Sequence, residues 1–147
     1  MVRIEKSIEI KAPPERVWEM LALDRWPEWM DEMKSAKYIS EVRTPEDKYR
    51  VGATAHITWK RGPPREHDDE ITESLENEKM THRSKGKYKS TITYILKPVE
   101  GGTRLTFLGD YEPPWGILGK TLAKLASGAG EKAWERALEK LKSILEK

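Results

Sequence analysis

One long amphipathic segment at the C-terminal end of the chain limits the possible folds most. Residues 115–147 repeat large apolar side chains at near-helical spacing, which predicts a single helix with one apolar face. That face comprises Trp115, Leu118, Leu122, Leu125, Trp134, Leu138, Leu141 and Leu145. Most of the preceding sequence has the pattern of short strands. Since a twisted antiparallel sheet has one apolar face to cover, we expect a curved sheet wrapped around this helix.

The N-terminal segment predicts one strand followed by two short helices. Residues 2–10 alternate apolar and polar side chains, as a strand does, although Lys6 falls on the apolar face and could mark a bulge. The two prolines of "APPERVWEML" (12–21) suit the start of a helix. Asp24 and Pro27 end that helix. A second short helix is expected to carry Trp29, Met30 and Met33.

Six further strands are predicted between these helices and the C-terminal one. Their ranges are 36–42, 53–60, 68–75, 80–85, 90–98 and 103–111. The last two are joined by "VEGG" (99–102), a connection rich in the glycine that hairpin turns need. A loop there places Leu96 opposite Leu105 and Tyr94 opposite Phe107, so that aromatic side chains meet on the inner face.

Three stretches carry a resemblance to a known family: "IEIKAPPERVWEML", "DRWPEWM" and "YILKPVEGGTRLTFLGDYE", followed by the C-terminal helix. In this order they resemble the START-related superfamily, which includes birch-pollen-allergen-like proteins, polyketide cyclases and lipid-transfer proteins. The resemblance covers essentially all 147 residues and implies one domain, 1–147. It implies an α+β helix-grip fold, with a curved antiparallel sheet of about seven strands around the long helix and a cavity between them. It also implies that the protein binds apolar molecules, while leaving the chemistry open.

The residues expected to line this cavity follow from strand parity, helix periodicity and the resemblance. They are Trp26, Trp29, Tyr38, Trp59, Ile71, His82, Ile92, Tyr94, Phe107, Trp115, Leu118 and Leu122. Two interpretations of "DRWPEWM" stay open, because large aromatics serve equally as a hydrophobic plug and as a wall over a ligand. Likewise, "SGAG" (127–130) within the long helix is either a kink or close crossing over the sheet, or room left for a ligand.

Only Glu73 and His82 are candidates for acid–base chemistry. A two-residue turn at 77–78 would pair them on the inner face, where the carboxylate would orient the imidazole and raise its basicity. Such a pair is either catalytic or a satisfied structural contact. His56 has the opposite parity to Ile57 and should face solvent. The run "EHDDE" (66–70) is interpreted as a solvated strand end rather than a metal site, because its alternate residues point to opposite faces.

Composition excludes several functional classes. The chain has no Cys, so thiol catalysis, disulfides and cysteine metal sites are excluded, and no motif predicts another metal or a cofactor. A net charge of +2 gives no basic footprint for nucleic acid. No stretch approaches the length of a membrane span and the N-terminus lacks a signal-peptide pattern, so we expect a cytoplasmic protein, monomeric or weakly dimeric. Many Lys and Glu residues with a single Asn suggest heat adaptation.

Three functions therefore compete. The first is binding or transport of a hydrophobic small molecule that is lipid-, isoprenoid- or polyketide-like. The second is an enzyme of cyclase, dehydratase or hydrolase type that acts on a related ligand through Glu73 and His82. The third is a protein-interaction module, which the superfamily also contains but to which no feature of this sequence points.

Overall fold

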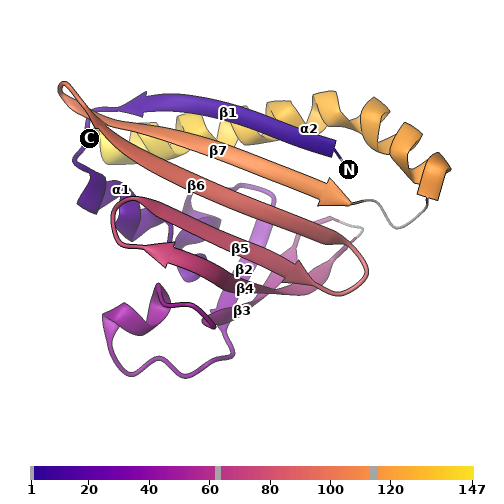
Figure 1. The fold of residues 1–147 in the computed structure, drawn as a ribbon, viewed down its shortest axis with the longest axis horizontal. Helices are drawn as coiled ribbons and strands as arrows, with labels where there is room; N and C mark the ends of the chain where they lie inside the picture. The colour runs from indigo at the N-terminus through magenta and orange to yellow at the C-terminus, as the bar shows by residue number, and fades with distance from the viewer. Residues whose placement is uncertain (1, 62–63, 113–115) are drawn as a thin grey trace.

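The computed structural model describes residues 2–61, 64–112 and 116–147, and it has the expected helix-grip architecture (Figure 1). The strands are β1 (Val2–Ile10), β2 (Met33–Tyr38), β3 (Thr54–Trp59), β4 (Glu66–Leu75), β5 (Lys79–Lys85), β6 (Lys89–Val99) and β7 (Gly102–Glu112). The helices are α1 (Pro14–Met20), the 3-10 helices η1 (Leu23–Glu28) and η2 (Pro45–Lys48), and α2 (Gly116–Leu145).

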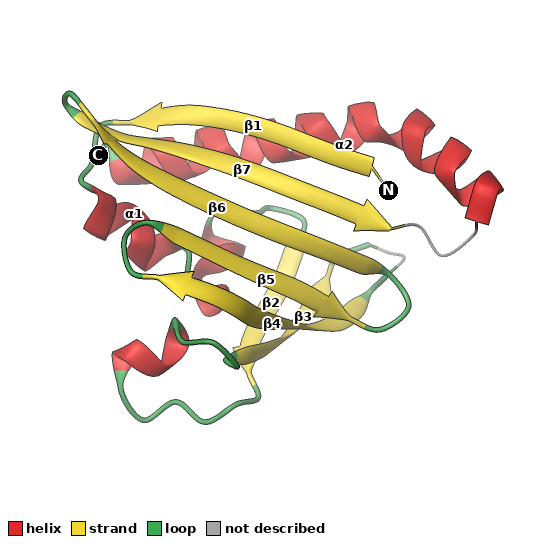
Figure 2. Cartoon of the chain, viewed as in Figure 1, coloured by secondary structure: helices red, strands yellow, loops and turns green. Residues whose placement is uncertain are grey.

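The strands form one sheet of seven, in the order β1-β7-β6-β5-β4-β3-β2, with every neighbouring pair antiparallel. This order places β1 at one edge and β2 at the other. Figure 2 shows α2 running along one face of the curled sheet, with α1 near the C-terminal end of α2. The long helix therefore covers the apolar face of the sheet, as its periodicity predicts.

One part of the core lies between this face and the last part of α2. From the sheet it takes alternate residues of β6 and β7, and from α2 it takes one stripe of leucines. These side chains are Ile92, Tyr94, Leu96, Leu105, Phe107, Leu138, Leu141 and Leu145. Burying each of them contributes roughly 1.5–3 kcal/mol relative to leaving it exposed, so the packing of α2 against the sheet makes a large contribution to the stability of this fold.

The hairpin of β6 and β7 has the register that the sequence predicts. Leu96 is opposite Leu105 and Tyr94 is opposite Phe107. The turn itself consists of Glu100 and Gly101, and Gly101 has φ 81°. Because glycine adopts positive φ without a steric penalty, the turn closes without disturbing the ladder.

The inner face of β1 explains two features that were left open. Lys6 causes no bulge, since the ladder with β7 is continuous, and it instead forms ion pairs with Glu131 and Glu135 of α2 at 3.4 and 2.8 Å. In the "SGAG" segment, a Cβ added to Gly130 would lie 3.3 Å from Cδ1 of Ile4. A close crossing of α2 over β1 therefore accounts for this glycine, while Gly128 faces open space.

The expected second helix and the strand after it are both shifted in the structure. The helix is the 3-10 helix η1, which ends at Glu28, so it carries none of Trp29, Met30 and Met33. Trp29 is its C-cap, and Met33 begins β2. Pro27, which has no N–H to donate, stands near the end of η1 and disfavours its continuation. The strand predicted over 36–42 ends at Tyr38, because the hydroxyl of Ser40 accepts the backbone N–H of Thr54 and interrupts the ladder.

The pairing of β4 with β5 also departs from the prediction. The turn contains three residues rather than two, with Asn77 at φ 63° and the Glu78 N–H bonded to the Leu75 carbonyl at 2.9 Å. A bulge then lies between Ile71 and Glu73. Because a bulge inserts one extra residue into its strand, the residues from Glu73 onward face the opposite side from the one that simple alternation predicts.

Candidate functional site

A cavity of about 250 Å³ lies between η1, the inner face of the sheet and the second half of α2. Its apolar wall is formed by Trp26, Trp29, Met30, Trp59, Ile92, Tyr111, Ala133, Trp134 and Ala137. Its polar residues are Asp31, Glu32, His67, Asp69, His82, Ser90 and Arg136. An apolar wall with a few convergent polar groups is the usual composition of a small-molecule site.

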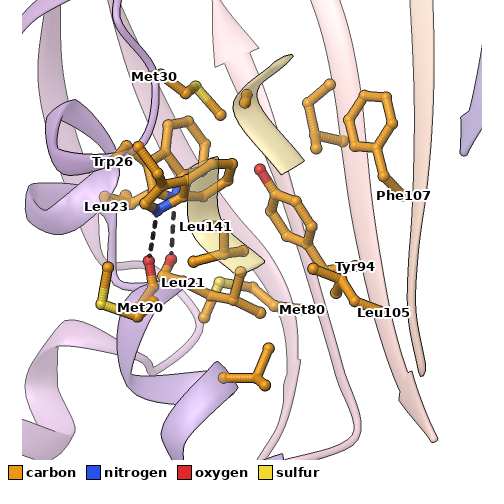
Figure 3. Close-up of a cluster of buried hydrophobic side chains, with 14 of the residues drawn as sticks. Met20, Leu21, Leu23, Trp26, Met30, Met80, Tyr94, Leu105, Phe107 and Leu141 are labelled. Atoms are coloured by element: carbon orange, nitrogen blue, oxygen red, sulfur yellow. Dashed lines mark hydrogen bonds between the residues drawn. The ribbon is translucent and has the colours of Figure 1, made fainter. Parts of the chain in front are cut away.

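Trp26 and Trp29 serve as both plug and wall. Their side chains are buried in the core and also line the cavity. Figure 3 shows Trp26 among the buried side chains of this region. The two indole N–H groups donate to backbone carbonyls, Trp26 to Leu21 at 3.0 Å and Trp29 to Met20 at 2.9 Å. These carbonyls lie at the C-terminal end of α1, where carbonyls lack intrahelical donors. The two indole N–H groups therefore supply hydrogen-bond donors to the carbonyls at the end of α1, while the indole rings close one end of the cavity.

A chain of polar side chains crosses the sheet at the cavity wall. The Trp59 indole donates a hydrogen bond to Nε2 of His67 at 2.8 Å. Nδ1 of His67 lies 3.8 Å from Oδ2 of Asp69, and Oδ1 of Asp69 lies 3.1 Å from Nδ1 of His82. Asp69 is 3 % exposed and His82 is 1 % exposed. A carboxylate this deeply buried requires hydrogen-bond donors, and the imidazole of His82 supplies one.

Two polar atoms beside this chain have no hydrogen-bond partner among the described residues. They are Nε2 of His82 and the hydroxyl of Tyr94, and both are buried. The two rings lie on adjacent strands with centroids 5.8 Å apart, and the ring of Trp26 lies 4.3 Å from that of His82. Since most buried polar atoms in proteins are hydrogen-bonded, the unpaired Nε2 of His82, which lines the cavity, marks a place where a bound molecule could supply the missing partner.

Tyr111 and Trp134 form a second polar contact at the cavity. The Trp134 indole donates to the Tyr111 hydroxyl at 2.7 Å, and its ring stacks on Phe107 at 3.8 Å. Burial raises the pKa of Tyr111 above its usual value, against the opposing effect of the Trp134 N–H, and the Asp69 carboxylate raises it further. Tyr111 lies close to Gly109, where an added Cβ would approach the Tyr111 ring to 2.9 Å. The absence of a side chain at Gly109 therefore leaves room for Tyr111.

The predicted pairing of Glu73 with His82 is wrong. His82 faces inward, as its parity predicts, but Glu73 lies on the other face, opposite Thr81, and pairs with Lys79 at 3.0 Å. The bulge after Ile71 is the cause, because it reverses the parity of the strand. The carboxylate partner of His82 is Asp69, which precedes the bulge and shares the inner face with Ile71.

The other predicted lining residues fall into three groups. Besides His82, the cavity is lined by Trp26, Trp29, Trp59 and Ile92. The second group belongs to the core or packs against it without lining the cavity, namely Ile71, Tyr94, Phe107 and Tyr38. The hydroxyl of Tyr38 instead joins the Leu23 N–H to the Lys48 carbonyl. The position of Trp115 and the side chains of Leu118 and Leu122 lie outside the described part of the structure.

The sequence prediction missed His67, Asp69, Tyr111 and Trp134 as cavity residues. Strand parity could have identified three of them as inward-facing residues. Asp69 and His67 alternate with Ile71, and Tyr111 alternates with Phe107. The interpretation of "EHDDE" as a solvated strand end is correct for Glu66 and Asp68 but wrong for the two residues that point inward.

His56 faces outward, as predicted, and lies between two carboxylates. Nδ1 is 2.8 Å from Asp68 and Nε2 is 2.8 Å from Glu66. The hydrogen bonds to Asp68 and then Glu66 raise the pKa of His56 above its usual value. This cluster lies on the opposite face of the sheet from the cavity.

Replacing His56 with Ala should destabilise the protein at low pH and have less effect at high pH. Because the folded-state pKa is raised, the stabilisation is complete below the unfolded-state pKa and is lost as pH rises through the folded-state pKa. The pairs are exposed, so the difference in unfolding free energy should stay below about 1 kcal/mol. Urea unfolding of both proteins at pH 5.5 and pH 9 measures it. An equal difference at the two pH values would contradict the assigned ion pairs.

The described residues include no cluster of three His, Asp, Glu or Cys side chains arranged to hold a metal ion. Nδ1 of His82 contacts Asp69, Nδ1 of His67 contacts the Asp68 carbonyl, and Nε2 of His67 already accepts the Trp59 indole N–H. None of the described helices is long and apolar enough to cross a membrane.

Comparisons with known proteins agree with this architecture. Protein TTHA0849 from Thermus thermophilus superposes with a TM-score of 0.75 at 19 % identity, covering 98 % of this chain and 97 % of that one. Protein BH1534 from Bacillus halodurans gives 0.72 at 19 %, covering 99 % and 98 %. Protein MLL2253 from Mesorhizobium loti gives 0.71 at 20 %, covering 98 % and 96 %. Identities this low show the fold alone.

The comparison with curated proteins gives no match. A family model described as polyketide cyclase / dehydrase and lipid transport, in contrast, matches residues 1–146. The match includes every residue of the cavity and nearly the whole chain. The protein therefore belongs to the polyketide cyclase / dehydrase and lipid transport family.

Proposed function

We propose that the protein binds a small, largely apolar molecule carrying one hydrogen-bonding group, in the cavity between η1, the sheet and α2. The observation that carries this proposal is the unpartnered Nε2 of His82, buried beside a wall of tryptophans. The family, whose description includes lipid transport, supports an apolar ligand. The buried, unpaired imidazole nitrogen supports a polar group on that ligand.

The size of the cavity favours a compact ligand. Its volume of about 250 Å³ is below the roughly 300–1,000 Å³ of sites for drug-sized molecules. A molecule of one or two fused rings therefore suits it better than an extended acyl chain. Flat rings also suit the tryptophan side chains, because aromatic pairs gain about 0.5–1.5 kcal/mol beyond their buried area.

Filling the cavity should abolish binding of a two-ring probe. We expect 2-naphthol to bind the wild-type protein, and Ala133→Phe to weaken binding by at least about tenfold because the new ring occupies the cavity. Ser143→Phe is the matched control, since Ser143 is an exposed residue of the same helix that does not line the cavity. Isothermal titration calorimetry on the three proteins measures the affinities. Equal affinity in all three would place the probe elsewhere, and no binding to the wild-type protein would contradict the proposed ligand class.

The same titration with naphthalene separates the polar contact from the apolar one. Naphthalene lacks the hydroxyl that would donate to Nε2 of His82, and a net hydrogen bond is worth about 1 kcal/mol. It should therefore bind roughly five- to tenfold more weakly than 2-naphthol. Native mass spectrometry of freshly purified protein, followed by solvent extraction, would identify the natural ligand as a discrete added mass that disappears on denaturation.

The expectations of a monomeric or weakly dimeric, cytoplasmic protein without nucleic-acid partners stay predictions. The near-balanced charge of the chain supports the last of these. The enzyme hypothesis based on Glu73 is withdrawn, because that carboxylate lies on the other face of the sheet.

A further inference from the structure

We propose that the cavity is an active site in which Nε2 of His82 acts as a general base, removing a proton from a carbon atom adjacent to a carbonyl group of the bound molecule. This inference rests on the proposed binding function and assigns the class of substrate, a compact cyclic ketone or related carbon acid. Three features of the site carry it: the protonation state of His82, the orientation of Asp69 and the hydroxyl of Tyr111.

The contact between Asp69 and His82 determines where the imidazole holds its hydrogen. A carboxylate can only accept hydrogen bonds, so the 3.1 Å contact places the hydrogen on Nδ1 of His82. Neutral His82 then has its lone pair on Nε2, the atom that has no partner. When Nε2 takes up a proton, the Asp69 carboxylate stabilises the resulting imidazolium. A buried base with its lone pair available is thus already in place.

His67 and Trp59 lie beside the carboxylate on the cavity wall. An indole N–H can only donate, so the 2.8 Å contact from Trp59 requires a lone pair on Nε2 of His67. The hydrogen of His67 is therefore on Nδ1, which donates to the backbone carbonyl of Asp68 at 3.4 Å and lies 3.8 Å from Oδ2 of Asp69. Asp69 is a positioning residue, because it acts through His82.

Tyr111 supplies the hydrogen-bond donor that an enolate needs. Its oxygen accepts the Trp134 indole N–H at 2.7 Å, which leaves its own O–H without an acceptor among the described residues. Burial raises the pKa of this hydroxyl, so it stays protonated at neutral pH. Tyr111 and His82 both line the cavity. A donor and a base on one cavity are the two groups required for proton abstraction next to a carbonyl.

The proposed step balances without an oxidant, a reductant or a second substrate. The C–H bond of the ligand breaks and an N–H bond forms at Nε2 of His82. The C–H electron pair becomes the C=C bond of the enolate, the carbonyl π pair moves to the oxygen, and this oxygen accepts the Tyr111 hydrogen bond. The imidazolium then returns its proton either to the same carbon, which regenerates the ligand, or to a conjugated carbon, which isomerises it. In deuterated water, the imidazolium exchanges its proton, so the carbon receives deuterium.

A purely structural role for the pair explains less of the geometry. A buried histidine that serves only the fold normally satisfies both ring nitrogens. Here one nitrogen is satisfied by Asp69, whereas the other is left unpaired beside a cavity. The nearby hydroxyl of Tyr94 is also unpaired. Leaving both unpaired destabilises the protein, and such a cost is typical of a functional site.

Deuterium exchange into 2-tetralone tests this activity. The probe is a two-ring ketone of about the same size as 2-naphthol. We expect the wild-type protein to accelerate loss of its C1 proton signal in deuterated buffer, followed by proton NMR. His82→Gln should reduce the protein-catalysed rate about a hundredfold or more. Tyr111→Phe should reduce it about ten- to a hundredfold, since one hydrogen bond to the enolate is lost. Both variants should still bind 2-naphthol.

His56→Gln is the matched control, because it removes an imidazole from the outer face of the sheet and should leave the rate unchanged. Asp69→Asn tests the positioning role. It should lower the rate and move the pH at which the rate falls toward lower pH, because an amide stabilises the imidazolium less than a carboxylate does. A merely structural role for Asp69 would leave that pH unchanged.

The outcomes separate this proposal from the binding proposal. If the wild-type protein binds 2-naphthol but exchanges 2-tetralone no faster than His82→Gln does, the general-base role is overturned while the binding function stands. If the wild-type protein does not bind 2-naphthol, both proposals fall. Should His82→Gln not fold, Tyr111→Phe and the Asp69→Asn pH profile decide: unchanged rates in both variants overturn the proposal.

Discussion

Replacing Trp29 with Ala should lower the free energy of unfolding by about 4 kcal/mol. The side chain is fully buried. Its ring contacts those of Trp26, Tyr94 and Trp134, at centroid distances of 6.4, 6.2 and 6.4 Å. The substitution removes these contacts, opens a large void next to the existing cavity and leaves the Met20 carbonyl without its donor. Urea unfolding monitored by circular dichroism measures the effect.

Two further variants show which part of the side chain matters. Trp29→Phe keeps a ring but not the N–H, so its cost should be about 1–3 kcal/mol, mainly from the unsatisfied Met20 carbonyl and the lost volume. Ile39→Ala is the surface control, because Ile39 is 60 % exposed, and should change stability by less than about 0.5 kcal/mol. A loss below about 1 kcal/mol for Trp29→Ala would show that this residue only lines the cavity and does not support the core.

The fold could be predicted from the sequence because its main determinants are periodic. The long helix follows from leucine spacing, and the β6–β7 register follows from a glycine turn between two alternating strands. The β4–β5 pairing was not predictable in the same way. Its register depends on Asn77 adopting positive φ and on a bulge before Glu73. Neither has a distinctive pattern, since asparagine also occupies ordinary turn positions and a bulge is a local response to packing.

The candidate site was only partly predictable, for a related reason. Strand parity correctly predicts that His82 faces inward, because the alternation is counted along one uninterrupted strand. Strand parity also predicts that Asp69 faces inward. Asp69 lies within a run of charged residues, however, and such a run is interpreted as solvent-exposed when its burial is unknown. The partner of His82 was therefore assigned to Glu73, on the wrong side of the bulge. Contacts between distant segments, such as Trp134 with Tyr111, depend on how α2 crosses the sheet, and strand or helix periods do not encode that crossing.

Gly102→Ala should be among the most destabilising single changes in the protein, at about 3 kcal/mol or more. Gly102 lies at the tip of the β6–β7 hairpin, where the end of β1 passes over it. A Cβ at this position would overlap the backbone oxygen of Ile10 and lie 3.0 Å from Cα of Lys11. Backbone atoms cannot rotate away as a side chain can, so the two segments must separate.

That separation would extend beyond the tip of the hairpin. The Ile10 carbonyl accepts the Ala12 N–H, and the Ala12 carbonyl accepts the Thr103 hydroxyl at 2.7 Å. Gly101→Ala distinguishes steric contact from backbone strain, because Gly101 has φ 81° but nothing within 4 Å of an added Cβ. It should cost only about 1–2 kcal/mol, the penalty for a left-handed residue. If the two variants lose equal stability in urea unfolding, turn conformation rather than the crossing of β1 limits the sequence here. A larger loss for Gly102→Ala would establish that the packing of β1 over the hairpin requires a residue without a side chain at this position.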